Sequence, residues 1–313
     1  MEGTKSALKN LSAIVEGVVP PVSEIQDLAA FADADLIILG AYVQQYQGLV
    51  HAIKEKNPKT KIAIWFTSSL GQSDLVQNGI ELQFLVTLKE MVKAGALDYL
   101  FVGGRKIYYP LHAAGFPKLF LLPFPLDLAK YEHFKDVKHV PYHVGFFNSK
   151  MNYKNVINQL TAMFLAKKQE PKLRLFINKL QPIHKFYLNQ VLEFNEFTDL
   201  DFIPDKGDYY KLVASMACTL QVNYADVCCY AAMSSMAMGV PCIMSNVVDW
   251  LPHTKLNRNL VVGRFDSPEY IAEKILTVAQ NPQHYVDHVK RMIHRVADMN
   301  NQAANHILRE LVE

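Results

Sequence analysis

Short apolar runs alternate with amphipathic helical segments along almost the whole chain, and this alternation limits the available folds more than any other feature. The first part holds four such runs, at 35–40, 61–66, 98–103 and 118–124. Helical periodicity lies between them, at 46–57, 80–95 and 106–115. The runs are apolar at successive positions, as parallel strands buried on both faces are. Strand, helix and strand in this order predict right-handed crossovers and a doubly wound parallel sheet.

The same rhythm restarts after residues 122–142, a segment of prolines and mixed charges that we interpret as a linker. Strands are expected at 142–147, 173–180, 200–205, 218–224 and 241–246, followed by the apolar run 259–265. Helices are expected at 154–168, 183–197, 209–217 and from Tyr230, with two more at the end of the chain. A length of 313 residues also fits two domains better than one.

We therefore predict an α/β protein with two Rossmann-like domains. Residues 1–139 form the first, and residues 140–290 form the second. Residues 291–313 form a C-terminal helix, for which packing back on the first domain is left open. Residues 1–30 are expected to be helical, because no strand pattern precedes the run at 35–40.

Composition excludes several classes of protein. Half of the residues are apolar and a fifth are charged, which is typical of a globular chain. The formal net charge of +2 argues against a nucleic-acid binder held mainly by phosphate contacts. No apolar run reaches the roughly 18 residues of a transmembrane segment. The four cysteines match neither a disulfide framework nor a zinc pattern. We expect a cytoplasmic protein with free buried thiols; peripheral membrane contact and a homo-oligomer are left open.

Ligands of open parallel sheets bind outside the carboxyl ends of the strands, so the loops that follow strands hold the candidate residues. In the first domain these loops are "FTSSLGQSD" and "VGGRKIYY", both polar and glycine-containing. They supply the candidate binding residues Thr67, Ser68, Ser69, Gln72 and Arg105. Neither a GxGxxG fingerprint nor a GxxxxGK[ST] phosphate loop occurs, which argues against a dehydrogenase or an ATPase.

In the second domain, "YADVCCYAAMSSMAMGVPCIMSN" (224–246) resembles the C-terminal domain of GT-B-fold glycosyltransferases of the retaining, family-4-like group. "HVGFFNSKMNYKNV" resembles the phosphate-loop strand of that family, and "NLVVGRFDSPEYIAEKIL" a later segment, so that the resemblance covers most of 142–280. It implies a GT-B-like fold, in which two doubly wound domains face each other across a cleft. In such a fold the first domain, with Thr67, Ser68, Ser69, Gln72 and Arg105, is expected on the acceptor side, and the second is expected to bind the nucleotide sugar.

The family's E-x7-E motif carries over only in part. Asp226 takes the position of the first Glu, near the donor sugar, and is the candidate catalytic residue. Ser234 stands at the second position, near the ribose, where a hydroxyl binds more weakly than a carboxylate. Phe146 and Phe66 also depart from the family, which often has an arginine and a histidine there.

The other donor-side candidates follow strands or begin helices. Lys154 matches the family's lysine for the diphosphate, although a lysine there is also compatible with a solvated surface. The amides at the start of the helix at Tyr230 suit a diphosphate, but "AAMSSMAMG" also suits a tightly packed core helix. The loop 203–210 either reads the nucleotide base or is a plain turn capped by Asp208. The donor-side set is Gly145, Lys150, Lys154, Asn178, Pro204, Asp205, Tyr230, Ala231 and Ser234.

The resemblance implies a hexosyltransferase. A hexose would be transferred from a nucleoside-diphosphate sugar, in which the nucleotide is UDP or GDP. The acceptor would be a hydroxyl of a glycan, lipid or protein, and the anomeric configuration would be retained. No cofactor and no essential metal are expected, because a helix dipole and basic side chains balance the leaving diphosphate. Two alternatives stay open: a non-catalytic GT-B-fold binding or scaffold protein that has lost the acid pair, and a GT-B-type sugar epimerase.

Overall fold

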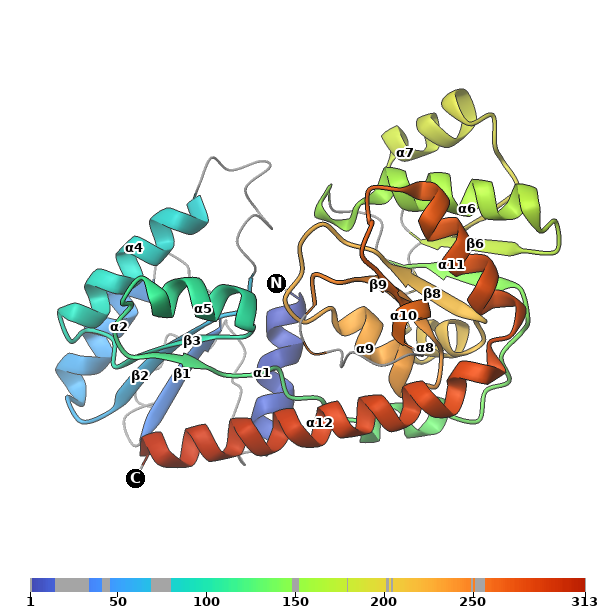
Figure 1. Cartoon of the computed structure of the whole chain (residues 1–313). Helices are drawn as coiled ribbons and strands as arrows, with labels where there is room; N and C mark the ends of the chain where they lie inside the picture. The colour runs from blue at the N-terminus through green and yellow to red at the C-terminus, as the bar shows by residue number, and fades with distance from the viewer. Residues whose placement is uncertain are drawn as a thin grey trace. The chain divides into compact units, whose positions relative to one another are not determined.

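The computed structural model describes two compact units, each built on one parallel sheet (Figure 1). The described residues are 2–14, 34–40, 46–68, 80–147, 152–178, 180–200, 203, 205–248, 250 and 257–312. Unit 1 comprises Met1–Asp127 and Ala297–Glu313, and unit 2 comprises Leu128–Val296. Within the described residues, no helix combines the length and the apolar character needed to cross a membrane.

The sheet of unit 1 has the strand order β1-β2-β3-β4. Its strands are β1 (Leu36–Gly40), β2 (Lys61–Phe66), β3 (Tyr99–Val102) and β4 (Leu119–Leu121). The helices that connect consecutive strands are α2 (Tyr46–Lys56), α4 (Ile80–Lys93) and α5 (Arg105–Ala113). Each strand neighbours the next, so right-handed crossovers place these three helices on one face of the sheet, as Figure 1 shows.

The remaining helices of unit 1 are tied to its chain by side-chain hydrogen bonds. Asn10 of α1 (Glu2–Ile14) donates to the carbonyl of Pro125 at 2.9 Å. Asn301, in the unit-1 part of α12 (Gln283–Val312), accepts from the amide of Leu126 at 3.1 Å. Lys61 at the start of β2 donates to the carbonyl of Leu311. The two ends of the chain therefore help to fold the first unit.

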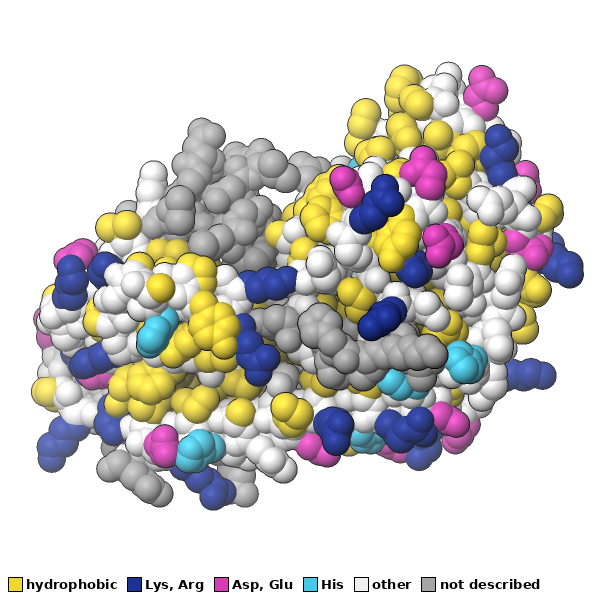
Figure 2. All heavy atoms as spheres, viewed as in Figure 1, with side chains coloured by type: hydrophobic (Ala, Val, Ile, Leu, Met, Phe, Trp, Pro, Cys, Tyr) yellow, Lys and Arg dark blue, Asp and Glu magenta, His cyan; other side chains and the backbone are white. Residues whose placement is uncertain are grey.

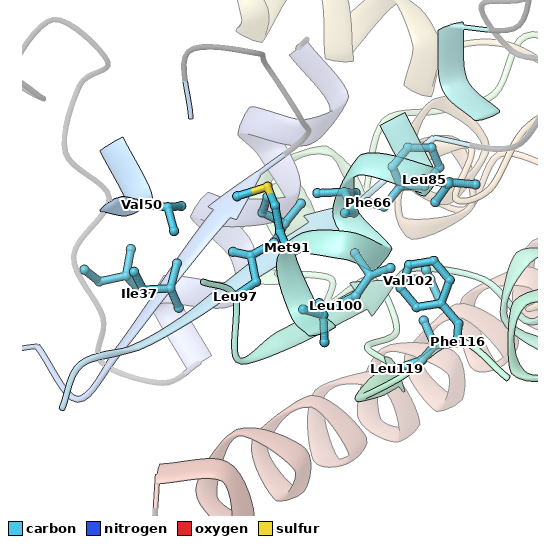
Figure 3. Packing of buried hydrophobic residues seen from close by; sticks show 14 of the residues in the cluster. Ile37, Val50, Phe66, Leu85, Met91, Leu97, Leu100, Val102, Phe116 and Leu119 are labelled. Carbon is cyan, nitrogen blue, oxygen red and sulfur yellow. The ribbon is translucent and has the colours of Figure 1, made fainter. Parts of the chain in front are cut away.

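The core of unit 1 lies between the sheet and the three connecting helices (Figure 3). Ile64, Leu100 and Val102 from the strands are fully or almost fully buried against residues such as Leu88 and Met91 of α4. Because these strands are covered by side chains at successive positions, they read as continuous apolar runs in the sequence.

Unit 2 has a six-stranded parallel sheet of order β10-β9-β8-β5-β6-β7. Its strands are β5 (His143–Phe146), β6 (Arg174–Asn178), β7 (Thr198–Leu200), β8 (Cys218–Gln221), β9 (Cys242–Ser245) and β10 (Val261–Val262). The chain runs from β5 outward to β7 on one side and returns to β8 on the other. The strand order therefore reverses between β5 and β8, and such a reversal opens a ligand-binding crevice at the carboxyl ends of the two strands.

The helical elements of unit 2 precede, connect or follow these strands. They are η3 (Ala129–Phe134), η4 (Asn152–Lys154), α6 (Val156–Gln169), α7 (Pro182–Phe186), η5 (Tyr187–Val191), α8 (Lys206–Ala214), α9 (Tyr230–Ala237), α10 (Asn257–Leu260), α11 (Pro268–Gln280) and the first part of α12. The α9 helix begins at the predicted residue. It ends before Gly239, whose φ of 84° is the left-handed conformation expected there.

Three expectations differ from the structure. The expected helix 183–197 is the short α7 followed by the π-helical η5, and Glu193 then turns the chain with a φ of 49°. The expected strand 200–205 lies earlier in the chain, because β7 is Thr198–Leu200 and the described residues 203 and 205 belong to no strand. Residues 128–139 belong to unit 2, because Tyr131 and Phe134 of η3 pack on Tyr210 of α8 with ring centroids 5.4 and 5.6 Å apart.

Candidate functional site

Two of the predicted site residues meet at the point where the strand order of unit 2 reverses. Lys154 ends η4, in the connection that leaves β5, and Asp226 lies in the loop that leaves β8. Lys154 Nζ lies 2.8 Å from Asp226 Oδ2, and the two side chains are only 5% and 10% exposed. Residues 72 positions apart thus form a buried ion pair at the carboxyl edge of the sheet.

The Asp226 carboxylate accepts hydrogen bonds from three protein donors. Lys154 Nζ and Asn223 Nδ2 both donate to Oδ2, each at 2.8 Å. The backbone amide of Cys229 donates to Oδ1 at 2.9 Å. A carboxylate has about four acceptor positions, so Oδ1 keeps the capacity to accept a further hydrogen bond. The position of this acid is fixed by the protein itself.

Electrostatics favour charged Lys154 and a neutral neighbouring thiol. Burial is the largest influence on Lys154 and acts to lower its pKa, but the negative charge of Asp226 and the hydrogen bond to it act in the opposite direction, and the pKa is raised overall. The ammonium therefore stays protonated at neutral pH. Burial, followed by the charge of Asp226, raises the pKa of Cys229 well above its ordinary value. A protonated buried thiol is a poor nucleophile.

All four cysteines are free and buried, as the sequence predicts. Burial raises the pKa of Cys218 and of Cys242 to about 12. These thiols therefore act as small core residues.

Gln159 of α6 joins the two segments that carry the ion pair. Its Nε2 donates to the carbonyl of Lys154 at 2.5 Å, and its Oε1 accepts from the amide of Val222 at 2.9 Å. The amide of Tyr224 also donates to the carbonyl of Tyr153 at 2.8 Å. The connection after β5 and the loop after β8 are thereby held side by side.

Cys229 caps α9 in a left-handed conformation, with a φ of 52° and a ψ of 60°. This conformation costs a non-glycine residue free energy, and the hydrogen bond from its amide to Asp226 helps to hold it. Trp250 Nε1 donates to the carbonyl of the preceding Cys228 at 2.7 Å. The loop from Asp226 to Tyr230 is thus a defined turn that orients the start of α9.

The other donor-side candidates have varied surroundings. Ser234 is buried, and its hydroxyl donates to the carbonyl of Ala231 at 3.0 Å. Tyr230 and Ala231 are half-buried in the first turn of α9. Asn178 is the last residue of β6 and is 5% exposed. Asp205 caps α8 by accepting from the amide of Asp208 at 2.8 Å, so the cap is Asp205 rather than Asp208.

Gly145 in β5 leaves room for an aromatic ring. A Cβ atom at this position would lie 2.2 Å from Cε2 of Phe147. The missing side chain is therefore already explained by packing inside the unit. Lys150 and Pro204, also predicted on the donor side, lie outside the described residues, as do Ser69 and Gln72 of the acceptor side.

The described acceptor-side candidates lie at the carboxyl edge of the unit-1 sheet. Thr67 and Ser68 follow β2 and are half-buried, and Arg105 begins α5 just after β3 and is exposed. β2 and β3 are hydrogen-bonded neighbours, with Phe66 paired to Val102 at their ends. These three residues therefore share one edge of one sheet.

Sequence reasoning missed Asn223 and Gln159. Asn223 is 1% exposed, holds Asp226, and accepts at its own carbonyl from Ser245 Oγ at 2.7 Å. A polar residue at the carboxyl end of a mainly apolar run was a usable signal for it. Gln159 lies inside a helix, where neither spacing nor motif distinguishes it.

No protein-family model matches the chain, and no curated protein matches it. Solved structures do. The pneumococcal O-GlcNAc transferase GtfA, in complex with UDP and GlcNAc, has a TM-score of 0.64 at 11% identity, over 92% of this chain and 60% of that one. TarM of S. aureus has a TM-score of 0.71 at 8% identity, over 92% of this chain and 57% of that one.

A UDP-forming α,α-trehalose-phosphate synthase from Burkholderia xenovorans has a TM-score of 0.64 at 11% identity, over 92% of this chain and 76% of that one. The chain thus spans only about three fifths of the length of the first two structures. Together with the two parallel sheets, these likenesses show that the chain has the GT-B fold predicted from the sequence.

Proposed function

We propose that this protein is a glycosyltransferase that uses a nucleoside-diphosphate sugar as donor. The observation that carries the proposal is the buried Lys154–Asp226 pair at the strand-order reversal of unit 2, in a chain with the GT-B fold. UDP is the first nucleotide to test, because one similar structure contains UDP and another is described as UDP-forming. The finer proposal is transfer of a hexose to a hydroxyl acceptor with retention.

Lys154 is the group proposed to meet the diphosphate. It is held protonated and is paired with the single carboxylate of Asp226, so a diphosphate that approaches it gains a charged hydrogen bond and competes with that carboxylate. The start of α9 contributes further, because its first backbone amides carry partial positive charge. This positive charge would stabilise the diphosphate as the bond to the sugar breaks.

Asp226 is proposed to orient the donor sugar. Its Oδ1 retains acceptor capacity beyond the amide of Cys229, and a sugar hydroxyl is a suitable donor for it. In the proposed step, the bond between the anomeric carbon and the diphosphate oxygen breaks, and a bond from the acceptor oxygen forms on the same face. The proton of the acceptor hydroxyl passes to the leaving diphosphate, so that charge and atoms balance.

Thr67, Ser68 and Arg105 of unit 1 are proposed to contact the acceptor. They offer two hydroxyls and one cation at the carboxyl edge of their sheet. This set suits an acceptor with several hydroxyl groups, such as a glycan or a glycosylated carrier.

A second candidate, a GT-B-fold binding or scaffold protein, is favoured by a specific observation. Asp226 already accepts from three protein donors, and the Ser234 hydroxyl already donates to the Ala231 carbonyl. Both positions of the acid motif therefore have partners within the protein. This candidate binds a nucleotide sugar but does not turn it over.

A thermal-shift panel followed by a turnover assay separates the two candidates. UDP, GDP, UDP-glucose and UDP-N-acetylglucosamine are added separately, and release of nucleotide is then measured with each donor that raises the melting temperature. A shift with turnover supports the transferase, and a shift without turnover over a panel of sugar acceptors supports the scaffold. If none of the four raises the melting temperature, the nucleotide site is not where we propose it.

A further inference from the structure

Exposed apolar side chains are concentrated on the outer side of α7 and η5. Ile183, Phe186 and Val191 are 62%, 58% and 59% exposed, and Pro182 at the start of α7 is exposed as well. We define the α7 surface as these four residues. Figure 2 shows hydrophobic side chains gathered over this part of unit 2, at the upper right. Single exposed apolar residues are ordinary, but a cluster of them indicates a binding surface.

A π-helical turn brings these side chains to one side of the segment. Ile183 and Phe186 are three positions apart on α7 and are therefore neighbours on one face of it. Phe186 and Val191 are five positions apart, which in an α-helix would place them on different faces. In η5 the hydrogen bonds join residues five apart, and the amide of Leu192 donates to the carbonyl of Tyr187 at 3.1 Å. Val191 therefore lies one turn beyond Phe186 on the same side.

The core of unit 2 does not need the α7 surface. Leu188 is fully buried on the inner side of the segment. The ring of the buried Phe194 packs on that of Phe164 in α6, with centroids 5.4 Å apart. The hydroxyl of Tyr187 lies 2.7 Å from Oγ1 of Thr161, also in α6. The segment is attached to α6 by these contacts, so the stability of the unit does not account for the apolar side chains on its outer side.

The charge beside the α7 surface is negative. The stretch 186–197 contains two glutamates and no Lys or Arg. One of them, Glu196, is paired with a lysine at 3.4 Å. The other, Glu193, follows η5 and is exposed, and it takes part in none of the ion pairs among the described residues. Lys185 of α7 is already paired with Asp199 at 2.5 Å.

We propose that the α7 surface binds an amphipathic helix of a partner protein. Such a helix presents apolar side chains along one side, at positions i, i+3, i+4 and i+7. They match the row formed by Ile183, Phe186 and Val191. A Lys or Arg at the edge of the bound helix pairs with Glu193. Phe is also among the side chains that are enriched in protein interfaces.

A basic amphipathic helix fits this surface better than other partners. The phosphates of an anionic membrane or of a nucleic acid would meet the carboxylate of Glu193 with charge of the same sign. A second copy of this chain, docked through the same surface, would bring two such carboxylates to one interface. Neither disadvantage applies to a helix that carries apolar residues and a flanking cation.

Selection from a displayed peptide library, with the full chain as the target, tests the proposal. The library holds helical peptides of about 15 residues, with Leu or Phe along one face and Lys, Glu or Gln at the flanking positions. The affinity of a selected peptide is then measured by fluorescence anisotropy. Phe186→Ser removes the aromatic ring of the surface, and Glu193→Lys reverses its charge. The matched controls are Val86→Ser, at an apolar residue of α4 that is 63% exposed, and Glu55→Lys, at an exposed glutamate of α2. Melting temperatures establish that each variant is folded.

We expect the selected peptides to carry Lys at the flanking positions. Phe186→Ser should weaken their binding about tenfold or more. Glu193→Lys should weaken it several-fold and should favour the same peptide with Glu in place of Lys, while both controls keep the affinity of the parent.

The proposal is overturned if no peptide is selected, or if the controls lose as much affinity as the variants of the surface. Self-association of the chain that Phe186→Ser abolishes in analytical ultracentrifugation, without peptide binding, would assign the surface to a second copy instead. Binding to anionic vesicles that Phe186→Ser abolishes, again without peptide binding, would assign it to lipid.

Discussion

Lys154 and Asp226 carry opposite charges inside unit 2. The free energy of burying and pairing these charges determines how a substitution of either residue changes the stability. A buried pair is costly to desolvate, but removal of one partner leaves the other charge buried and uncompensated. Asp226 is further anchored by Asn223 and by the amide of Cys229. The pair therefore contributes to the stability of the fold and is also part of the proposed site.

Single substitutions of this pair should destabilise the protein strongly. Lys154→Met or Asp226→Leu is expected to lower the free energy of unfolding by about 3–5 kcal/mol, because each leaves one buried charge without its partner. The double variant should lose clearly less than the sum, by about 1 kcal/mol or more. Urea unfolding of the four proteins measures this coupling.

The exposed pair Lys135–Glu132 is the control for this cycle, since its side chains are 49% and 47% exposed. Lys135→Met should leave the urea midpoint nearly unchanged. If the Lys154 and Asp226 variants lose as little free energy of unfolding as this control, or if their losses are strictly additive in the double variant, the two residues do not form the buried pair.

At the residue scale, the sequence could predict that Lys154 and Asp226 belong to the site, but not that they form an ion pair with each other. Lys154 and Asp226 were candidates because they match positions of the family motifs in loops that follow apolar runs; the structure places them after the two strands at the strand-order reversal. The sequence interpretation gave them separate tasks, one at the diphosphate and one at the sugar. Their direct contact depends on β5 and β8 being neighbours, and periodicity along the chain does not contain strand order.

At the scale of elements, the end of α9 has a sharp stereochemical requirement. Gly239 has a φ of 84°, and a Cβ atom there would lie 2.5 Å from Cε of Lys290. Gly239→Val should therefore lower the free energy of unfolding by about 1–2 kcal/mol or more, through the left-handed backbone and the contact with α12. Urea midpoints of parent and variant measure the loss.

Gly263→Ala is the matched control for this turn, because no atom lies within 4 Å of a Cβ atom built there and its φ is not positive. It should leave the midpoint close to that of the parent. Coincident midpoints for Gly239→Val and the parent would show that the turn is not built this way.

Elements whose signal is local were predicted well, and elements set by tertiary contacts were not. β2 has the bounds 61–66 read from the sequence, because its apolar run is flanked by polar residues. The expected helix 183–197 failed, since its apolar residues do not keep one helical face buried: Ile183, Phe186 and Val191 are 62%, 58% and 59% exposed. The chain there forms α7 and a π-helical turn instead.

At the scale of the molecule, one buried and three half-buried histidines should make unit 2 sensitive to acid. Burial is the largest cause that lowers the pKa of His139, His143, His184 and His288 below 6.5. Above about pH 6.5 such a histidine is neutral in both states. Below it the unfolded chain takes up the proton first, so stability falls with pH until the folded histidine also titrates.

Urea unfolding at several pH values between neutral and mildly acidic tests this expectation. The midpoint should fall as the pH drops through 6.5, and His184→Leu should make the fall shallower, because His184 is 6% exposed and its pKa is lowered by burial alone. His133→Leu, an exposed control in the same unit, should keep the slope of the parent. An unchanged slope in His184→Leu contradicts the assignment.

The GT-B fold was accessible from the sequence although its solved neighbours share only about a tenth of their residues with this chain. The apolar pattern of buried strands and the periodicity of helices persist at such low identity, because many combinations of residue types produce them. Donor and acceptor cannot be predicted from these patterns, because their recognition depends on a few side chains in loops. Four of the predicted site residues, Ser69, Gln72, Lys150 and Pro204, lie outside the described residues.

We propose that unit 2 carries a nucleotide-sugar site in which Asp226 contacts the sugar and Lys154 contacts the diphosphate. It is tested most directly by Asp226→Asn, which removes the charge and keeps the shape. Release of nucleotide from the donor found by thermal shift is measured for parent and variant, alongside the affinity for the free nucleotide. We predict that the variant loses transfer and keeps nucleotide affinity within a few-fold of the parent. Transfer at the parental rate in folded Asp226→Asn would contradict the claim.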